Sequence, residues 1–329
     1  MTSFAALIDH PSRIAEVRRA AHKLAVEAGF DATSSEKVSI VVTEAGTNLL
    51  KHAGRGQMFI RAVEFEEQIE IEMLALDNGP GIQDVEMSSR DGYSTTGTSG
   101  TGLGAIARLA RHWDLYSAPG AGSALLARLA PGSNGRPTGQ REIGIVQIPK
   151  PGEEVCGDEW GAYVSTEYKT VLLADGLGHG PEAAKAARCA VEILNNHPDL
   201  RPGELIETVH QMLRSTRGAA VAAARLDNDQ RIITFAGLGN IGGGVYQSDL
   251  VRHMVSINGT AGVDARHIRE FTYPWPEGAL VILHSDGIGT HWSIQDYPGL
   301  ATRDPALIAG VIYRDHARGN DDATIVVSK

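Results

Sequence analysis

The sequence has little of what marks secreted, membrane or disulfide-stabilised proteins. Only two of its 329 residues are cysteine, too few for a disulfide framework, and this fits a reducing compartment. No apolar run reaches the roughly 18 residues that a membrane-spanning helix needs. Asp9, His10 and Arg13 interrupt the start of the chain, so we expect no signal peptide. We therefore expect a cytoplasmic protein with no membrane contact.

Basic residues are also scarce. The chain has 30 Lys and Arg against 40 Asp and Glu, a formal net charge of −10. Nucleic-acid binding requires clustered positive charge, so we expect no nucleic-acid partner. The hydrophobic content of 42% is ordinary for a globular protein, and the length favours two domains.

A Gly- and Pro-rich segment divides the chain. Residues 131–140 contain three Gly and two Pro among small polar residues. Gly frees the backbone and Pro blocks helix continuation, which is typical of a linker. We predict a first domain at 1–130, a linker at 131–141 and a second domain at 142–329.

Hydrophobic periodicity predicts both helices and strands in each part. A capping box at Thr33–Glu36 would begin the second helix. In the first part we expect helices at 11–29, 33–49 and 103–112 and strands at 57–65, 68–76, 113–118 and 122–129. In the second we expect helices at 180–197, 202–216 and 304–318 and strands at 143–149, 160–166, 169–174, 219–226, 231–236, 242–247, 279–284 and 323–328. Many strands with a few long helices favour an α+β fold built of sandwiches.

Three motifs in the first part suit a nucleotide. Glu44 and Asn48 stand four residues apart on one helical face, where the amide could hold Mg²⁺ and the carboxylate polarise a hydroxyl. Taken alone, the pair is better explained as part of an exposed polar face. Asp77 ends a predicted strand and precedes Gly79 and Gly81, which fits either a ligand-binding turn or a plain tight turn.

The third motif is a glycine-rich run that opens a helix. Backbone amides at such a position attract phosphate, although no Lys follows the glycines as it would in a P-loop. Together the three motifs resemble the GHKL ATPase family, which includes histidine-kinase ATP-binding domains and anti-sigma-factor kinases of the RsbW and RsbT type. The resemblance covers about residues 10–130. The resemblance implies that three glycines of this motif lie along the phosphates, namely Gly100, Gly102 and Gly104.

This resemblance implies ATP with Mg²⁺ as the cofactor of the first domain. It makes Asn48 the Mg²⁺ ligand, Glu44 the activating carboxylate and Asp77 the adenine-binding residue, with Gly79 and Gly81 beside it. The run Asn48–Ala53 is similar to the serine-kinase branch, and no separate phospho-accepting His domain is evident.

Acidic motifs punctuate the second part. Most adjoin apolar runs, so the carboxylates are expected at strand ends. Clustered carboxylates repel one another unless a cation lies among them, and an all-oxygen ligand set favours Mg²⁺ or Mn²⁺. Each Asp-Gly alone could be a simple turn, but their combination favours a metal centre. The motifs are Gly157-Asp158-Glu159, Asp175-Gly176-Leu177-Gly178-His179-Gly180, Ser285-Asp286-Gly287 and Asn320-Asp321-Asp322-Ala323-Thr324.

These motifs resemble the metal-dependent type 2C protein phosphatases, the PPM family, and its bacterial SpoIIE-like branch in particular. The resemblance covers about residues 143–329 and implies two Mn²⁺ or Mg²⁺ ions. It makes Asp175 the residue that bridges both ions, with the Gly176 carbonyl, Asp286 and Asp321 as further ligands and Asp158 close by. Asp321 is favoured over Asp322.

Three neighbouring features leave alternatives open. His179 could orient water or substrate, or have only a structural role at a helix start. We expect Cys156 to be a packed residue, because the expected chemistry needs no thiol. The segment Cys156–Glu159 has no basic residue, although many eukaryotic relatives carry an Arg there for the substrate phosphate. Compact bacterial relatives also lack it, so phosphate binding could rest on the metal ions alone.

The two resemblances together predict a bifunctional signalling regulator, with an RsbT-like kinase joined to an RsbX-like phosphatase. Such relatives act on small STAS-domain proteins in bacterial partner switching, so phosphorylated and unphosphorylated STAS-domain proteins are the expected partners. A sigma factor or downstream phosphatase, and a homodimer, are further partners that the resemblance allows. The alternatives are a first domain that only senses nucleotide or sequesters a sigma factor, and a second domain with an inactive metal site.

Overall fold

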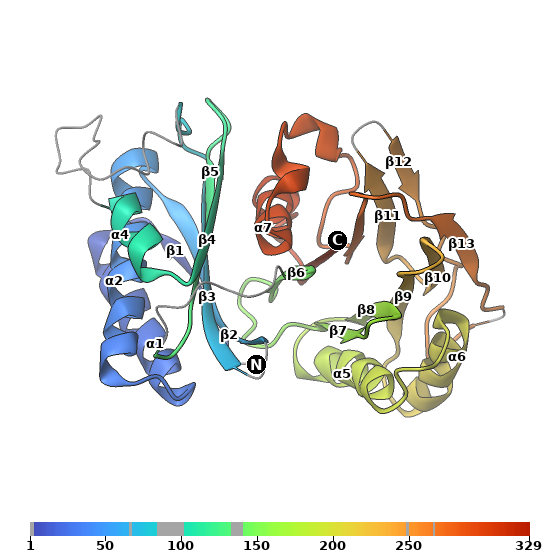
Figure 1. Ribbon diagram of the computed structural model, residues 1–329. Helices are drawn as coiled ribbons and strands as arrows, with labels where there is room; N and C mark the ends of the chain where they lie inside the picture. Colours follow the sequence, from blue (N-terminus) through green and yellow to red (C-terminus); the bar gives the residue numbers. More distant parts are fainter. Residues whose placement is uncertain (1–2, 66–67, 84–101, 133–140, 248–249, 266) are drawn as a thin grey trace. The chain divides into compact units, whose positions relative to one another are not determined.

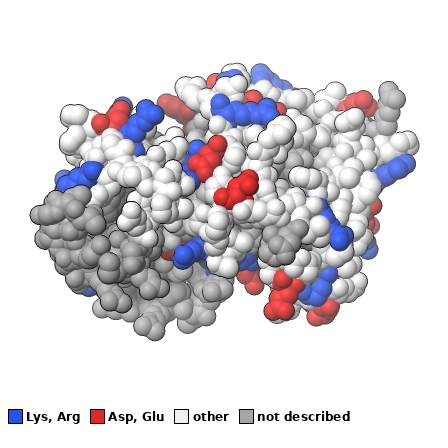
Figure 2. Space-filling view, turned by 90° about the horizontal axis from the view of Figure 1, so that it is seen from above, with Lys and Arg blue, Asp and Glu red and all other residues white. Residues whose placement is uncertain are grey.

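The computed structural model describes residues 3–65, 68–83, 102–132, 141–247, 250–265 and 267–329 (Figure 1). The chain divides into two compact units, Met1–Arg141 and Glu142–Lys329, and each is described by itself. Within the described ranges, no helix is long and apolar enough to cross a membrane. Figure 2 shows one face of the molecule, where Lys and Arg side chains are interspersed with Asp and Glu.

The first unit is one antiparallel sheet with helices on one face (Figure 1). Its strand order is β1-β2-β3-β5-β4, and every neighbouring pair is antiparallel. The elements are β1 (Ser3–Ile8), α1 (Pro11–Glu27), α2 (Ala32–Asn48), a π-helical turn (Leu49–Ala53), β2 (Gly56–Phe65), β3 (Gln68–Asp77), α4 (Gly102–Leu109), β4 (His112–Ser117) and β5 (Ser123–Leu129).

Alternation along β3 explains how this sheet is covered. Ile71, Met73 and Ala75 join the hydrophobic core with α1 and α2, while Glu70 and Glu72 belong to the opposite face. The expected helices and strands are present, and β1 is an additional strand. It pairs with β2 through backbone hydrogen bonds that its own short sequence does not reveal.

The predicted capping box at Thr33–Glu36 is wrong. The helix begins earlier, at Ala32, and its N-cap is Asp31, whose Oδ1 accepts a hydrogen bond from the backbone N–H of Ser34 at 2.7 Å. Asp is as good an N-cap as Thr, and it stands where the extended backbone ends. Thr33 therefore lies inside the first turn.

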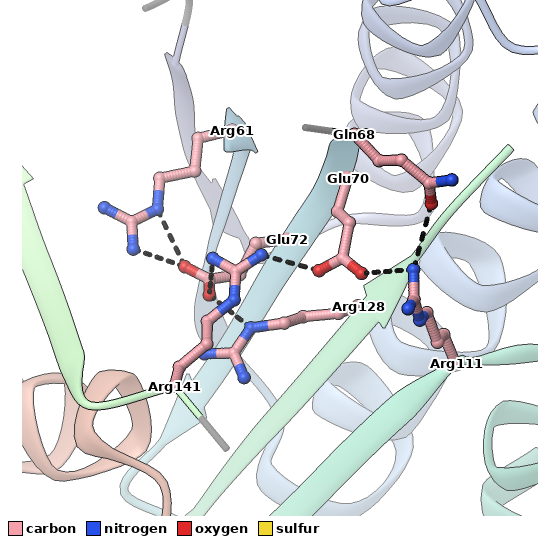
Figure 3. Close-up of polar contacts among 7 residues, drawn as sticks. All are labelled: Arg61, Gln68, Glu70, Glu72, Arg111, Arg128 and Arg141. Atoms are coloured by element: carbon pink, nitrogen blue, oxygen red, sulfur yellow. Dashed lines mark hydrogen bonds and ion pairs between the residues drawn. The ribbon is translucent and has the colours of Figure 1, made fainter. Parts of the chain in front are cut away.

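Glutamates and arginines form a cluster on the face of β2, β3 and β5 that carries Glu70 and Glu72 (Figure 3). Glu72 accepts hydrogen bonds from Arg61 Nε and Arg128 Nε, both at 2.7 Å. Burial disfavours ionisation of Glu72, but Arg61, Arg128 and Arg141 outweigh it and lower its pKa to about 2. This carboxylate is therefore held in its charged form.

The same cluster secures the residue that follows the glycine-rich segment. Arg141 Nη2 donates a 2.5 Å hydrogen bond to Glu70 Oε2, and its guanidinium lies 4.7 Å from the centre of the Phe65 ring. Arg111 Nη1 lies 3.3 Å from Glu70 Oε1 on the other side (Figure 3). The predicted linker thus ends at an anchored residue. Ser133–Gln140 lie outside the described residues.

We predict that Glu72→Gln destabilises the first unit by about 3 kcal/mol, because it leaves buried arginines without their carboxylate. Hydrogen exchange of β3 amides would measure the loss. Glu64→Gln, an exposed carboxylate on β2, is the matched control and should have no effect. The lowered pKa also means that Glu72 stabilises above its ordinary pKa, and that this stabilisation is lost as pH falls from about 4.5 to about 2. Equal exchange in both variants would contradict the prediction.

The second unit contains two five-stranded sheets, ordered β13-β10-β9-β8-β7 and β12-β11-β14-β15-β6. Helices α5 and α6 pack on the first sheet and α7 packs on the second. The elements are β6 (Ile143–Ile148), β7 (Asp158–Val164), β8 (Tyr168–Gly176), α5 (Pro181–Asn196), α6 (Pro202–Met212), β9 (Ala219–Asp227), β10 (Ile232–Leu238), β11 (Gly242–Gln247), β12 (Leu250–His253), β13 (Phe271–Pro274), β14 (Leu280–His284), α7 (Pro305–His316) and β15 (Ala323–Ser328).

Strand β8 is buried on both faces, which explains its unbroken apolar run. Val171 and Leu173 point into the core between the sheets, while Leu172 and Ala174 pack in the core formed with α5 and α6. The unit is thus an α-β-β-α sandwich, and the predicted α+β fold class is confirmed. The short strands β12 and β13 were not expected from the sequence.

Candidate functional sites

Strand pairing brings the predicted carboxylates of the second unit to the ends of four strands. Asp158 is the first residue of β7 and lies directly opposite Asp175, near the end of β8. We expected the strand to begin two residues later, and the longer strand makes this pair neighbours. In the other sheet, Asp286 follows β14, and Asp321 and Asp322 precede β15.

Hydrogen bonds hold the ends of β14 and β15 together at this point. The Ser285 backbone N–H donates to the Thr324 carbonyl at 3.0 Å, and the Thr324 N–H donates to Ser285 Oγ at 2.9 Å. Asp286 follows β14 and Asp321 precedes β15, so both residues lie at the same end of this antiparallel pair of strands. Each sheet contributes carboxylates from neighbouring strand ends.

Burial and mutual repulsion perturb these carboxylates strongly. Burial, then the charges of Asp158, Asp286 and Asp321, raise the pKa of Asp175 to about 9. Burial also raises the pKa of Asp158 to about 7, although the nearby hydroxyls of Ser285 and Thr324 oppose the shift. Such values mean that little positive charge offsets Asp158 and Asp175, whereas Arg318 opposes the rise in the pKa of Asp286.

The donor atoms fit a hard divalent cation. Both carboxylate oxygens of Asp158 and Oδ2 of Asp322 are buried, with no hydrogen-bond partner of normal geometry among the described residues. Buried carboxylate oxygens of this kind are the ligands that Mg²⁺ and Mn²⁺ prefer. No three His, Cys, Asp or Glu side chains in the described ranges stand close enough together to hold an ion as they are. The carboxylates thus surround the site without a closed coordination sphere.

Asp321 and Asp322 differ in their environment. Asp322 is buried, and its Oδ1 accepts a hydrogen bond from the Lys150 backbone N–H at 2.8 Å. Asp321 is partly exposed, and its Oδ1 accepts from the Asp322 N–H at 3.0 Å. Asp322 therefore fixes the loop before β15, which leaves Asp321 the more accessible donor.

Other residues support the site. Asn240 Nδ2, in the loop after β10, donates a 2.8 Å hydrogen bond to Asp286 Oδ2, and sequence reasoning missed it. The run of three glycines that follows in β11 was the available signal, since it marks close backbone packing beside this loop. His179 Nδ1 lies 2.6 Å from Glu153 Oε1, an exposed pair. Burial and the charges of Asp158 and Asp322 raise the pKa of the Cys156 thiol, as expected of a packed cysteine.

The first unit brings the predicted nucleotide residues near one another. A Cβ at Gly102 would lie 3.0 Å from Glu44 Oε2 and 3.3 Å from Asn48 Oδ1. The start of α4 is therefore beside the polar pair on α2, and glycine leaves space there. Gly104 is buried within α4, and Gly100 lies outside the described residues.

The turn after β3 is fixed by its glycines. Asp77 Oδ1 accepts a hydrogen bond from the Gly79 N–H at 2.8 Å, and a Cβ at Gly79 would lie 2.7 Å from Ala53 Cβ. Gly81 has φ +72°, and a Cβ there would collide with the Ala118 carbonyl. The tight-turn role left open by the sequence is therefore present, and it sets the position of Asp77 at the end of the central strand β3.

Comparison with known proteins agrees with both geometries. Residues 8–128 match the histidine kinase-like ATPase domain family, and residues 166–329 match the family of stage II sporulation protein E (SpoIIE). The serine/threonine-protein kinase RsbT of Bacillus subtilis (strain 168) is 32% identical over 114 residues, which cover 35% of this chain and 86% of RsbT. Through its first unit this chain belongs to the family of RsbT, and its second unit contains a domain that matches the SpoIIE family. The family resemblances expected from the motifs are confirmed.

Two further relatives match the chain. The phosphoserine phosphatase RsbX of Bacillus subtilis (strain 168) is 23% identical over 145 residues, 44% of this chain and 73% of RsbX. A solved chain of the bacterial stressosome has a TM-score of 0.54 and 27% identity, and the match covers 57% of this chain and 98% of that one. Asp175, Asp286 and Asp321 lie within the residues matched to SpoIIE, and Asp158 lies just before them.

We predict that Asp175→Asn has opposite effects without and with metal. Without metal it removes a repelled charge, so the second unit should gain at least about 1 kcal/mol at pH 9. Because the folded pKa lies above the ordinary value, wild type loses stability as pH rises from about 4 to about 9, and the variant should escape this loss.

With saturating Mn²⁺ wild type should gain thermal stability and Asp175→Asn should not. Thermal unfolding with and without chelator measures both effects, and Glu207→Gln, an exposed carboxylate on α6, is the control. A variant that Mn²⁺ stabilises as much as wild type would contradict the assignment of Asp175.

Proposed function

We propose that residues 142–329 form a Mg²⁺- or Mn²⁺-dependent protein-serine/threonine phosphatase. The observation that carries this proposal is the pair of Asp158, which is buried, and Asp175, which is partly buried. They lie opposite each other and have no ion-pair partner among the described residues. The match to SpoIIE and the likeness to the phosphoserine phosphatase RsbX support the same reaction class. The reaction is hydrolysis of a phosphoserine or phosphothreonine ester to the alcohol and inorganic phosphate.

In this reaction, side chains of the second unit would bind the cations and hold the ligating carboxylates in position. Asp175 would hold both cations, helped by the Gly176 carbonyl, with Asp286 and Asp321 as further ligands and Asp158 near them. Two divalent cations, when bound, supply activation of water and neutralisation of phosphoryl charge. Asn240 would keep the carboxylate of Asp286 in one orientation through its 2.8 Å hydrogen bond. His179 is held by Glu153 at the edge of the same loop.

We propose further that residues 1–130 bind ATP with Mg²⁺ and phosphorylate a serine or threonine of a partner, with residues 131–141 as the linker. Glu44 would accept the hydroxyl proton, Asn48 would hold Mg²⁺ and Asp77 would bind adenine beside Gly79 and Gly81. Gly100, Gly102 and Gly104 would lie along the phosphates. The approach of Gly102 to Glu44 and Asn48, and the 32% identity to RsbT, support this role.

The proposed setting is a bacterial partner-switching pathway in the cytoplasm. Phosphorylated and unphosphorylated STAS-domain proteins are the proposed substrates, and the likeness to RsbT and RsbX supports such partners. A first domain that only senses nucleotide or sequesters a sigma factor is the second candidate. The carboxylate of Glu44 and the amide of Asn48, side by side at Gly102, favour transfer over binding alone.

The phosphatase proposal predicts metal-dependent turnover of a phosphoserine-bearing STAS-domain protein. Asp175→Asn should lower kcat at least about 100-fold, because the cations supply several kcal/mol of charge stabilisation. Phosphate release is the measurement, with Glu207→Gln as the control and a chelator as the second test. Equal turnover in wild type and Asp175→Asn would refute the proposal.

The kinase proposal predicts that Glu44→Gln retains ATP binding but slows phosphate transfer to an unphosphorylated STAS-domain protein by about 100-fold or more. Transfer is followed by intact-protein mass spectrometry and ATP binding by calorimetry. Glu36→Gln, an exposed carboxylate on the same helix, should transfer at the wild-type rate. Wild-type protein that binds ATP but transfers nothing would favour the sensing alternative.

A further inference from the structure

The proposed phosphatase site needs a positive group for its substrate, and this requirement rests on the proposed function of residues 142–329. A phosphoserine ester brings close to two negative charges to a site that already gathers aspartates. The segment from Cys156 to Glu159 supplies no Lys or Arg. Bound cations would be shared with the carboxylates, so a further positive group would favour the substrate phosphate.

The ladder between β8 and β9 leads to Arg217. Asp175 pairs with Ala220 and Gly176 pairs with Ala219. The Leu177 N–H continues this pattern beyond the strands, since it donates to the Gly218 carbonyl at 3.0 Å. The next position in register places Arg217 beside Gly178, within the loop that follows Asp175.

The side chain of Arg217 occupies the space that Gly178 leaves free. Gly178 has φ +96°, and a Cβ there would lie 3.2 Å from Arg217 Nη1. The guanidinium thus lies against the backbone of the Asp175–Gly180 loop. Any other residue at position 178 would crowd this guanidinium and strain the backbone. Gly178 therefore allows the turn and also allows the Arg217 guanidinium to lie close to the loop.

The backbone that carries Arg217 is held on both sides. Thr216 Oγ1 donates to the Leu213 carbonyl at 2.7 Å and accepts from the Gly218 N–H at 3.0 Å. Gly218 has φ +86°, and a Cβ there would lie 2.6 Å from the Ala261 carbonyl. Arg217 thus extends from a closed turn, which limits the backbone freedom that would be lost when its side chain binds a ligand.

The guanidinium itself is uncommitted. Arg217 is exposed and has no hydrogen bond or ion pair with the described residues. Arg188, on α5, lies 3.8 Å from Glu159 and is thus partly neutralised. Arg318 is also exposed, and its backbone N–H donates to the Gly287 carbonyl, but its charge acts on Asp286 and opposes the rise in the pKa of that carboxyl, so it is already partly offset. Arg217 combines a fixed place beside the loop with free donors.

We propose that Arg217 binds the phosphoryl group of the phosphoserine substrate from the Gly178 side of the carboxylates. Its planar guanidinium offers two parallel N–H donors to two phosphoryl oxygens, a geometry that a lysine cannot reproduce. It supplies the positively charged side chain that is absent from the segment Cys156–Glu159. It is a substrate-binding residue and takes no part in holding the metal ions.

The test compares Arg217→Ala and Arg217→Lys with Arg214→Ala, an exposed arginine on the same segment. Arg217→Ala should raise both the KM for the phosphorylated STAS-domain protein and the Ki of inorganic phosphate by about 10- to 100-fold. Arg217→Lys should fall between, and Arg214→Ala should match wild type. Stabilisation by Mn²⁺ should be unchanged in all three, which separates phosphate binding from folding and metal binding.

Unchanged KM and Ki in an active Arg217→Ala enzyme would overturn the inference and leave the phosphatase proposal intact. If wild type shows no metal-dependent turnover, the phosphatase proposal fails first. Calorimetric titration of inorganic phosphate into the Mn²⁺-loaded protein then still decides the role of Arg217. Weaker binding by Arg217→Ala than by Arg214→Ala would support it, and equal binding would refute it.

Discussion

The second unit depends on one unfavourable interaction, the burial of like charges where two sheets end. Asp158 and Asp175 face each other across β7 and β8, and burial raises the pKa of both. An arrangement of this kind lowers the stability of the unliganded fold when both carboxylates are ionised, and either a bound cation or protonation relieves the repulsion. Packing elsewhere must outweigh this cost, and β8 does so with apolar side chains buried on both faces.

In the first unit, by contrast, a buried carboxylate has its positive partners within the chain. Glu72 is buried as well, but Arg61 and Arg128 contact it, so its pKa falls to about 2. The same kind of side chain is thus satisfied within the protein in one unit and left unsatisfied in the other. A carboxylate that serves structure has its partners in the chain, whereas one placed for ligand binding has partners missing.

Strand ends and helices were readable from the sequence because local patterns encode them. The apolar run before Asp175 predicted a buried strand, and the glycines beside each Asp predicted turns. Strands β1 and β13 escaped detection because they are short and owe their existence to pairing with β2 and β10. The cap at Asp31 was missed because Thr33 offered an equally plausible start to the helix.

Site residues could be predicted from the sequence only where a residue type suited to the chemistry stands in a recognisable motif. Each Asp was found because short acidic motifs, two of them Asp-Gly pairs, repeat near strand ends, while Asn240 and Arg217 belong to no such motif. Their positions follow from register and loop packing, and each comes from a segment far along the chain from the residue it contacts, Asp286 for Asn240 and Gly178 for Arg217. A sequence pattern therefore identifies the donors of a site more readily than the groups that orient them or that meet the substrate.

The two sites also differ in what they require of the fold. Glu44 and Asn48 share one helix, so a single element fixes their spacing and only α4 must pack beside it. The carboxylates of the second unit come from the starts of β7 and β15 and the ends of β8 and β14, two strands in each sheet. Their spacing depends on how the sheets pack. A change in the packing of the two sheets would therefore alter the proposed metal site before it altered either sheet. The spacing of Glu44 and Asn48 depends on one helix and has no such sensitivity.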